Sequence, residues 1–253
     1  MKNTNYAKIA ATYDASSKRH IINKDPIIEL LTSTKNPIRI LDLGCGTGNY
    51  LARQKESFAK EQIEWYGIDK SAEMLQVAKN KLQSVHFTNV AAEELPFEDS
   101  FFDYIVCNHA YHHFIDKTTA FDHVKRCLKP YGHFAINSIY PPYMKNSWIY
   151  HYFPQAFERD KERFLGKEAL YAFFSKAKGF KTYLDIHATV KEVSLSYVQE
   201  EASLRNYSQL DVVDDDVYKR GLDRIAHAKS KNAEQVFDYA KIFLLAVKTK
   251  NPS

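Results

Sequence analysis

Short apolar runs and helical apolar stripes alternate along the first 140 residues of the chain. The runs are continuous and have the length of strands, which is typical of strands buried on both faces of a sheet. The predicted strands lie at 38–43, 63–68, 85–90, 101–107 and 133–139, with helices at 49–59, 71–82 and 120–128. Ser71 is a good N-cap for the second helix, and the third is predicted to end in a turn at 129–132. Strands that alternate with helices predict a parallel sheet in an α/β fold.

The pattern becomes less regular after Tyr140. Residues 141–166 are aromatic and charged without a clean period, which predicts a cap inserted into the fold. A helix at 168–177 that stops at Gly179, a strand at 180–190, mainly helical sequence at 194–230 and a last strand at 242–247 follow. We expect a seven-stranded, mostly parallel sheet flanked by helices.

We expect the whole chain, 1–253, to form a single domain. Its predicted parts are a helical arm (1–36), a core (37–140), two cap insertions (141–166 and 191–235) and two segments that complete the core (167–190 and 236–250).

Composition narrows the class of protein. No apolar run is long enough to cross a bilayer, and the first residues lack the apolar centre of a secretory signal, so a cytoplasmic protein without membrane contact is expected. The net charge of +4 comes from scattered Lys and Arg, which disfavours a nucleic-acid partner. Cys45, Cys107 and Cys127 are widely spaced, which fits neither a disulfide framework nor a CxxC metal pair.

A glycine-rich turn follows the first predicted strand. Gly44, Gly46 and Gly48 form G-x-G-x-G directly after Asp42, and Asp69 ends the second strand. Such glycines let the backbone approach a ligand closely at the carboxyl ends of the strands, where open α/β sheets bind their ligands. The glycine spacing favours S-adenosylmethionine over NAD. Asp42 is placed to accept hydrogen bonds from the ammonium of that cofactor, and Asp69 from its ribose diol.

These motifs and two later ones resemble the class I S-adenosylmethionine-dependent methyltransferases, in particular the bacterial small-molecule branch related to the ubiquinone and menaquinone enzymes. The resemblance spans residues 6–140 and rests on 41–48, 67–71, 91–97 and 108–113. It implies a Rossmann-like fold with S-adenosylmethionine as methyl donor and S-adenosylhomocysteine as product. The cofactor-binding residues it implies are Tyr13, Asp42, Gly44, Cys45, Gly46, Gly48, Asp69, Lys70, Met74, Ala92, Glu93 and Asn108.

One position departs from the family pattern. Relatives often carry Asp where this chain has Ala91, and that carboxylate would accept a hydrogen bond from the adenine amino group. We expect Glu93 or a backbone carbonyl to replace it, or adenine to be held by apolar packing against Ile68, Met74 and Leu95. The loss of one such bond would cost about 1 kcal/mol.

The segment 6–14, with Tyr6 and Tyr13, resembles the arm that closes over the cofactor in this branch. A helix that merely packs through its tyrosines is the alternative. After the fourth strand, His109 and His113 are the candidate catalytic residues, because histidine can remove a proton from an acceptor near neutral pH. Two histidines four residues apart do not complete a metal site, so no metal is expected.

The acceptor pocket is expected where the arm and the cap meet the core. The candidate acceptor-binding residues are Tyr13, His109, Tyr140, Tyr143, Trp148, Tyr152 and Arg205. Aromatic faces and guanidinium groups would suit an aromatic or acidic small molecule, with Arg159 and Arg163 as further partners for a carboxylate. The aromatic residues would alternatively fasten the cap to the sheet.

The sequence therefore predicts a methyltransferase acting on oxygen, nitrogen or carbon of a small-molecule acceptor, as a monomer or a homodimer. Three alternatives stay open. In the first, the acceptor is RNA or protein, and this alternative predicts a basic groove around the mouth of the pocket. The second is a cofactor-binding accessory protein without catalysis, which Ala91 motivates, and the third is a nicotinamide dehydrogenase.

Overall fold

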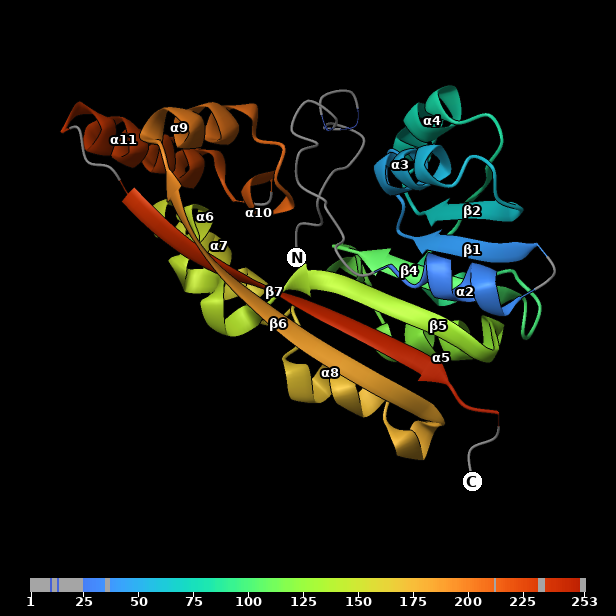
Figure 1. The fold of residues 1–253 in the computed structure, drawn as a ribbon. Coiled ribbons are helices and arrows are strands. Elements are labelled where there is room, and N and C mark those ends of the chain that lie inside the picture. The colour runs from blue at the N-terminus through green and yellow to red at the C-terminus, as the bar shows by residue number, and fades with distance from the viewer. Residues whose placement is uncertain are drawn as a thin grey trace.

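The computed structural model describes residues 10, 13, 25–34, 37–211, 213–231 and 235–250. Within them, seven strands form one sheet in the order β3-β2-β1-β4-β5-β7-β6 (Figure 1). The strands are β1 (Ile38–Leu43), β2 (Ile63–Asp69), β3 (His86–Asn89), β4 (Phe102–Asn108), β5 (Leu128–Ile139), β6 (Phe180–Val193) and β7 (Gln235–Lys248). Strands β1 to β5 are parallel, and β7 runs antiparallel to β5 and β6. The predicted seven-stranded, mostly parallel sheet is confirmed.

Some of the described α-helices cover the two faces of the sheet, and others form the cap. They are α2 (Ile27–Ser33), α3 (Asn49–Ser57), α4 (Ala72–Lys81), α5 (Lys117–Cys127), α6 (Trp148–Tyr152), α7 (Pro154–Asp160), α8 (Lys167–Phe173), α9 (Leu195–Leu204), α10 (Ser208–Asp211) and α11 (Asp215–Ser230). Side chains alternate along β1 as a strand requires: Ile38 and Ile40 pack with α2 and α3, whereas Leu41 and Leu43 belong to the cluster that contains α5 and α8. The Ser71 side chain caps α4 as predicted, accepting a hydrogen bond from the Met74 N–H at 3.2 Å.

Strands β6 and β7 continue past the sheet core as a two-stranded ribbon. The pairing of β7 with β5 ends at Ile139–Lys241, while β6 and β7 remain paired for six more positions, from Ala188–Ala240 to Val193–Gln235. In Figure 1 the ribbon leads to α9, on the side to which the arrowheads of β4 and β5 point. The cap helices therefore stand beyond the carboxyl ends of the parallel strands.

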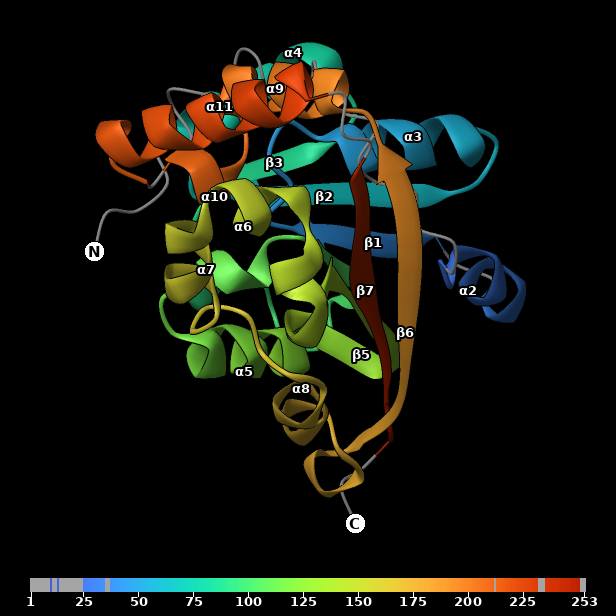
Figure 2. The same cartoon turned by 90° about the vertical axis from the view of Figure 1, so that its left-hand side faces the viewer.

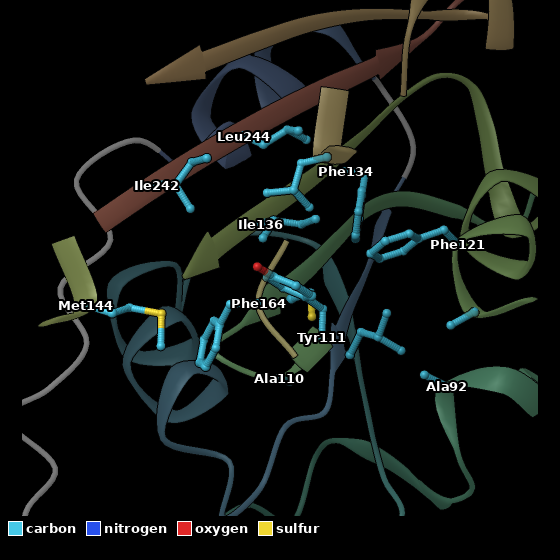
Figure 3. Packing of buried hydrophobic residues seen from close by; sticks show 14 of the residues in the cluster. Ala92, Ala110, Tyr111, Phe121, Phe134, Ile136, Met144, Phe164, Ile242 and Leu244 are labelled. Carbon is cyan, nitrogen blue, oxygen red and sulfur yellow. The ribbon is translucent and has the colours of Figure 1, made fainter. Parts of the chain in front are cut away.

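The cap shares its hydrophobic core with the sheet. Trp148, Phe153 and Ile225 are buried in the same cluster as Leu41 and Phe121. Figure 2 shows α9 and α11 side by side above α6 and α7. Close to the sheet, Tyr111 packs among Ile136, Phe164 and Ala110 in this cluster (Figure 3). Because the apolar surface of the cap is buried against the core, the two parts are expected to unfold together.

Several predicted boundaries were wrong. The turn expected at 129–132 lies inside β5, where the register against β4 shifts between the Phe102 and Tyr104 pairings. The helix expected at 168–177 ends at Phe173 and is followed by a 3₁₀ turn, with Gly179 as its left-handed C-cap at φ 78°. Of the predicted arm, α2 is helical, whereas Tyr6 and most of the arm lie outside the described residues.

The contact between α11 and α6 can be tested at Gly221. Replacing a helix-interior glycine by alanine ordinarily stabilises a helix by about 1 kcal/mol. At Gly221 the added Cβ would overlap the Phe153 ring, so Gly221→Ala is expected to lower the free energy of unfolding by about 1–3 kcal/mol in urea titrations. Gly166→Ala is the control, because its Cβ would lie 3.6 Å from the nearest atom, Glu168 Oε2. A more stable Gly221→Ala variant would contradict this packing.

Candidate functional site

A cleft opens at the carboxyl ends of β1, β2 and β4. Its walls come mainly from the loops that follow these strands and β3, together with Tyr13 from the arm. The lining residues are Tyr13, Asp42, Gly44, Cys45, Gly46, Thr47, Asn49, Tyr50, Ile68, Asp69, Lys70, Met74, Val90, Ala91, Ala92, Glu93, Asn108, His109, Ala110, His113, Phe114 and Ile115. The cleft thus lies where ligands bind in open α/β sheets.

The glycine turn exposes its backbone to the cleft. Gly44 and Gly46 have left-handed φ values of 77° and 53°, which glycine adopts at little cost. A Cβ on Gly44 would lie 2.5 Å from the Ala110 Cβ, so the turn and the loop after β4 are in close contact. A Cβ on Gly46 would meet nothing within 4 Å, which places this backbone against open space. A ligand can therefore contact the turn directly.

Asp69 is fixed by two backbone hydrogen bonds. Its Oδ2 accepts the Gly46 N–H at 2.8 Å, and its Oδ1 accepts the Ser71 N–H at 2.9 Å. Each carboxylate oxygen retains a second lone pair for a ligand hydroxyl. Burial nevertheless raises the pKa of Asp69, while these hydrogen bonds lower it. The carboxyl group is held in one orientation before a ligand arrives.

Asp42 is the most unusual acid of the cleft. Its side chain is only 2% exposed, and no hydrogen-bond partner for Oδ1 is present among the described residues. Burial, reinforced by the nearby Asp69 carboxylate, raises the pKa of Asp42 to about 8. A buried carboxyl group without a partner is costly, and a cationic group in the cleft would relieve that cost.

The wall after β4 carries polar groups at its start. The Asn137 amide donates to Asn108 Oδ1 at 2.9 Å, while the buried Asn108 Nδ2 has no hydrogen-bond partner within the described part of the chain. His109 follows with a left-handed φ of 51°, and its N–H donates to the Asn137 carbonyl at 2.8 Å. Such a conformation is uncommon outside glycine and is often found at functional sites.

The predicted bases, His109 and His113, both line the cleft. Burial, helped by the charges of Arg163, Lys70 and Lys117, holds the pKa of His113 well below its usual range. A neutral imidazole can accept a proton at physiological pH. His112 is instead buried between neighbouring rings, 4.0 Å from the His113 ring and 4.2 Å from that of Phe164. His112 therefore packs behind His113 and supports the loop after β4.

The wall expected to hold adenine differs from the prediction. Glu93 lines the cleft, but its Oε1 accepts the N–H groups of Ile115 at 2.6 Å and Asp116 at 3.1 Å. Glu93 thus fastens the loop that brings Ile115 to the cleft, and its role in place of the missing acid at Ala91 stays a prediction. Leu95 is buried away from the lining.

Apolar side chains that the prediction omitted, Val90, Phe114 and Ile115, join Ile68 and Met74 in the lining. Ile115 is 87% exposed, an unusual position for a large apolar residue at the edge of a cleft. Its place directly after the histidine cluster was the only signal in the sequence.

Several predicted site residues lie elsewhere. Of the predicted cofactor-binding residues, only Gly48 is absent from the lining; it is the left-handed N-cap of α3. Among the described acceptor candidates, Tyr13 and His109 line the cleft, whereas Tyr140, Tyr143, Trp148, Tyr152 and Arg205 do not.

Three of these acceptor candidates make contacts within the cap. Arg205 donates to the carbonyls of Leu210 and Val213 and to Asp215. Tyr152 donates to Gln235 at 2.6 Å, and Trp148 packs edge-on against Tyr207. These contacts help to hold the cap together. The role of all five residues in acceptor binding stays a prediction.

Within the described residues, no group of three His, Cys, Asp or Glu side chains is placed to hold a metal ion. The three cysteines are buried free thiols. The described helices include none that is long and apolar enough to span a membrane.

Comparison with known proteins identifies the family. Residues 34–181, more than half of the chain, match the family described as a methyltransferase domain. The chain is 38% identical over 109 residues to the uncharacterized methyltransferase YcgJ of Bacillus subtilis, covering 41% of this chain and 42% of YcgJ. It is 30% identical over 145 residues to the demethylmenaquinone methyltransferase of Thermotoga maritima, covering 55% of this chain and 62% of that protein. The matched region thus spans less than two thirds of either relative.

The fold is shared with a solved structure. The crystal structure of the Bacillus subtilis YcgJ protein superposes with a TM-score of 0.59 at 21% identity, covering 89% of this chain and 98% of that one. The chain belongs to the methyltransferase domain family. Its family and fold are those expected of the predicted class, whose methyl donor is S-adenosylmethionine.

The residues of the cleft fit this donor. Asp42 Oδ1 is a buried acceptor without a partner, which suits the ammonium of the methionine end. The Asp69 carboxyl group, held by two backbone hydrogen bonds, suits a ribose diol. The open space at Gly46 leaves room for the part of the cofactor that joins its methionine end to the ribose. The apolar wall of Ile68 and Met74 offers surface to adenine.

The raised pKa of Asp42 predicts a pH dependence of cofactor binding. Asp42 holds a proton below about pH 8 in the ligand-free folded protein, but it loses this proton near pH 3.8 in the unfolded chain. The free energy of unfolding therefore falls as the pH rises from 3.8 to about 8. An ammonium at Oδ1 favours the ionised form, so ligand binding releases this proton. The affinity for S-adenosylhomocysteine, measured by calorimetry, is therefore expected to rise from about pH 6 and to level off near pH 8.

Asp42→Asn should bind more weakly and lose this pH dependence, because the amide does not ionise. Asp122→Asn is the control, since Asp122 is an exposed residue of α5 paired with Lys125. An unchanged affinity across this pH range in the wild type would contradict the assignment of Asp42 to the ammonium.

Proposed function

We propose that this protein transfers the methyl group of S-adenosylmethionine to a small-molecule acceptor in the cleft. The observation that carries the proposal is Asp42 Oδ1, a buried acceptor without a partner beside the glycine turn. The braced Asp69 carboxyl group at the end of the neighbouring strand supports it. The bound donor supplies an electrophilic methyl on sulfur, so the protein chiefly has to align the reacting atoms and exclude water.

His113 is the proposed base for an acceptor that arrives protonated. The low pKa of its imidazole keeps the ring neutral, and the ring lines the cleft next to Phe114. As the acceptor atom forms its bond to the methyl carbon and the sulfur–carbon bond breaks, a ring nitrogen of His113 takes the acceptor proton. His109 begins the same wall from a fixed backbone position and is the second candidate.

A small acceptor is favoured over a macromolecule. The Thermotoga maritima relative is named for a small acceptor, demethylmenaquinone. The Lys and Arg residues are scattered along the sequence, and the net charge is only +4. An RNA-binding enzyme is expected to have a concentrated block of basic residues instead.

The direct test is turnover with a panel of small acceptors. Purified protein with S-adenosylmethionine is expected to release S-adenosylhomocysteine only when a competent acceptor is added. His113→Gln should lower the rate by about 100-fold or more with an acceptor that must lose a proton, since general-base catalysis typically contributes this much. Affinity for S-adenosylhomocysteine should change little.

His227→Gln, an exposed position of α11, is the matched control and should keep the wild-type rate. Turnover that is unaffected by His113→Gln would remove this residue from the mechanism. Binding of S-adenosylhomocysteine without turnover on any acceptor would favour a non-catalytic accessory protein.

A further inference from the structure

Two asparagines interrupt an otherwise apolar face of the sheet next to the cleft. On this face, Val106 of β4 and Ala135 of β5 belong to the buried cluster that also contains residues of α2 and α3. Side chains two positions apart along a strand point to the same face, so Asn108 and Asn137 share it. The two residues are also direct partners in the register of β4 and β5. Two carboxamide groups therefore lie side by side at the carboxyl ends of these strands.

The side chains of this pair bind each other. Asn137 Nδ2 donates a hydrogen bond to Asn108 Oδ1 at 2.9 Å. Asparagine is depleted in strands, and the three residues before Asn137, 134–136, are fully buried and apolar. An amide in such surroundings is costly unless it is hydrogen-bonded. The bond to Asn108 supplies this compensation.

The main chain of Asn137 holds the next residue of the cleft wall. Its carbonyl accepts the His109 N–H at 2.8 Å, and His109 has a left-handed φ of 51°. Asn108 and His109 both line the cleft, whereas Asn137 is not part of the lining that the described residues form. One residue of β5 thus supports two consecutive residues of the wall from behind, the first through its side chain and the second through its backbone.

The carboxamide that Asn137 holds lies on the same face of the sheet as Asp42. Asp42 is paired with Val106 in the register of β1 and β4, and its side chain points to the same face as Ile40. Asn108 comes two positions after Val106 and points to this face as well. Because Oδ1 is bound to Asn137, the Asn108 carboxamide cannot rotate without the loss of that bond. Its orientation is therefore set before a ligand arrives, which lowers the ordering cost of binding.

We propose that Asn137 is a positioning residue of the cofactor site, which acts by fixing the orientation of the Asn108 carboxamide in the cleft wall. The proposal rests on the proposed function, because it concerns the cleft in which S-adenosylmethionine is proposed to bind. Asn137 itself does not contact the cofactor. A role confined to the stability of the sheet would instead leave the affinity of the folded protein unchanged.

A double-mutant cycle with S-adenosylhomocysteine tests this role. Asn137→Leu removes the donor and keeps a side chain of similar shape, and calorimetry should show about fivefold weaker binding, the equivalent of one hydrogen bond. In an Asn108→Ala background, the same substitution should change the affinity by less than about twofold, because the group on which Asn137 acts is gone. Wild-type affinity of Asn137→Leu, or an equal loss in both backgrounds, would overturn the proposal.

Gly221→Ala is the control for stability. Its added Cβ would overlap Phe153, and neither residue lines the cleft, so this variant should be less stable in urea and bind S-adenosylhomocysteine as the wild type does. A loss of affinity in Gly221→Ala equal to that in Asn137→Leu would attribute both losses to reduced stability and would contradict the positioning role. Should Asn137→Leu not fold, Asn137→Ser takes its place in the cycle, because the shorter side chain also withdraws the amide donor from Asn108.

The wild-type affinity separates this proposal from the proposed function. Failure of the folded wild type to bind S-adenosylhomocysteine would contradict both. Binding by the wild type that Asn137→Leu matches would contradict the role of Asn137 alone and leave the proposed function intact.

Discussion

Two carboxyl groups at the ends of neighbouring parallel strands determine the character of the cleft. Strands β1 and β2 pair from Ile38–Ile63 to Leu43–Ile68, so Asp42 and Asp69 are brought to the same edge of the sheet. Asp42 is buried and Asp69 is partly buried, and the pKa of each is raised mainly by its burial. Asp69 is compensated by backbone N–H groups, whereas Asp42 Oδ1 is not. Asp42 Oδ1 is therefore a buried acceptor that a cationic group of a ligand in the cleft would satisfy.

Opposite charges mark the two ends of this cleft. Asp42 and Asp69 form an acidic end beside the glycine turn, while Lys70, Lys117 and Arg163 make the end near His113 basic. A sulfonium cofactor and an anionic acceptor would each meet the charge that favours it. Burial is the main reason why the pKa of His113 is low, and the nearby cations lower it further. Substrate selection and base catalysis would then depend on one set of charges.

The β6–β7 ribbon gives this sheet its cap. Six residue pairs between β6 and β7 continue beyond the end of β5, and the helices that follow share a hydrophobic cluster with the sheet. Because Gly221 has no side chain, α11 packs closely on Phe153 at the end of α6, and this contact fixes the position of α11.

The sequence predicted the parallel half of the fold well, because buried parallel strands are continuous apolar runs and the Ser71 cap is a local signal. It underestimated β6 and β7, whose outer parts leave the sheet core. The missed parts are residues 191–193 of β6 and 235–241 of β7, which lie at or beyond the end of the pairing with β5. The register shift in β5 was missed because Pro130 and Gly132 are typical of turns.

For the site, residues in sequence motifs were found and residues placed by tertiary contacts were not. The glycine turn, Asp42 and Asp69 follow strands directly, and their position at the cleft could be deduced from topology alone. Nothing in the sequence shows that Glu93 binds the N–H groups of Ile115 and Asp116. Arg205 has a suitable chemistry for acid recognition, but its guanidinium group binds carbonyls of Leu210 and Val213 within the cap. The sequence does not show such tertiary partners.

The most direct test of this account is a crystal structure of the protein with S-adenosylhomocysteine. The account predicts the ammonium of the ligand on Asp42, directly or through one water, and the ribose hydroxyls on Asp69, with the sulfur facing the His109–His113 wall. A ligand bound in this cleft with Asp42 still lacking a partner, or one bound elsewhere on the protein, would contradict the central claim that the two acids form the cofactor site.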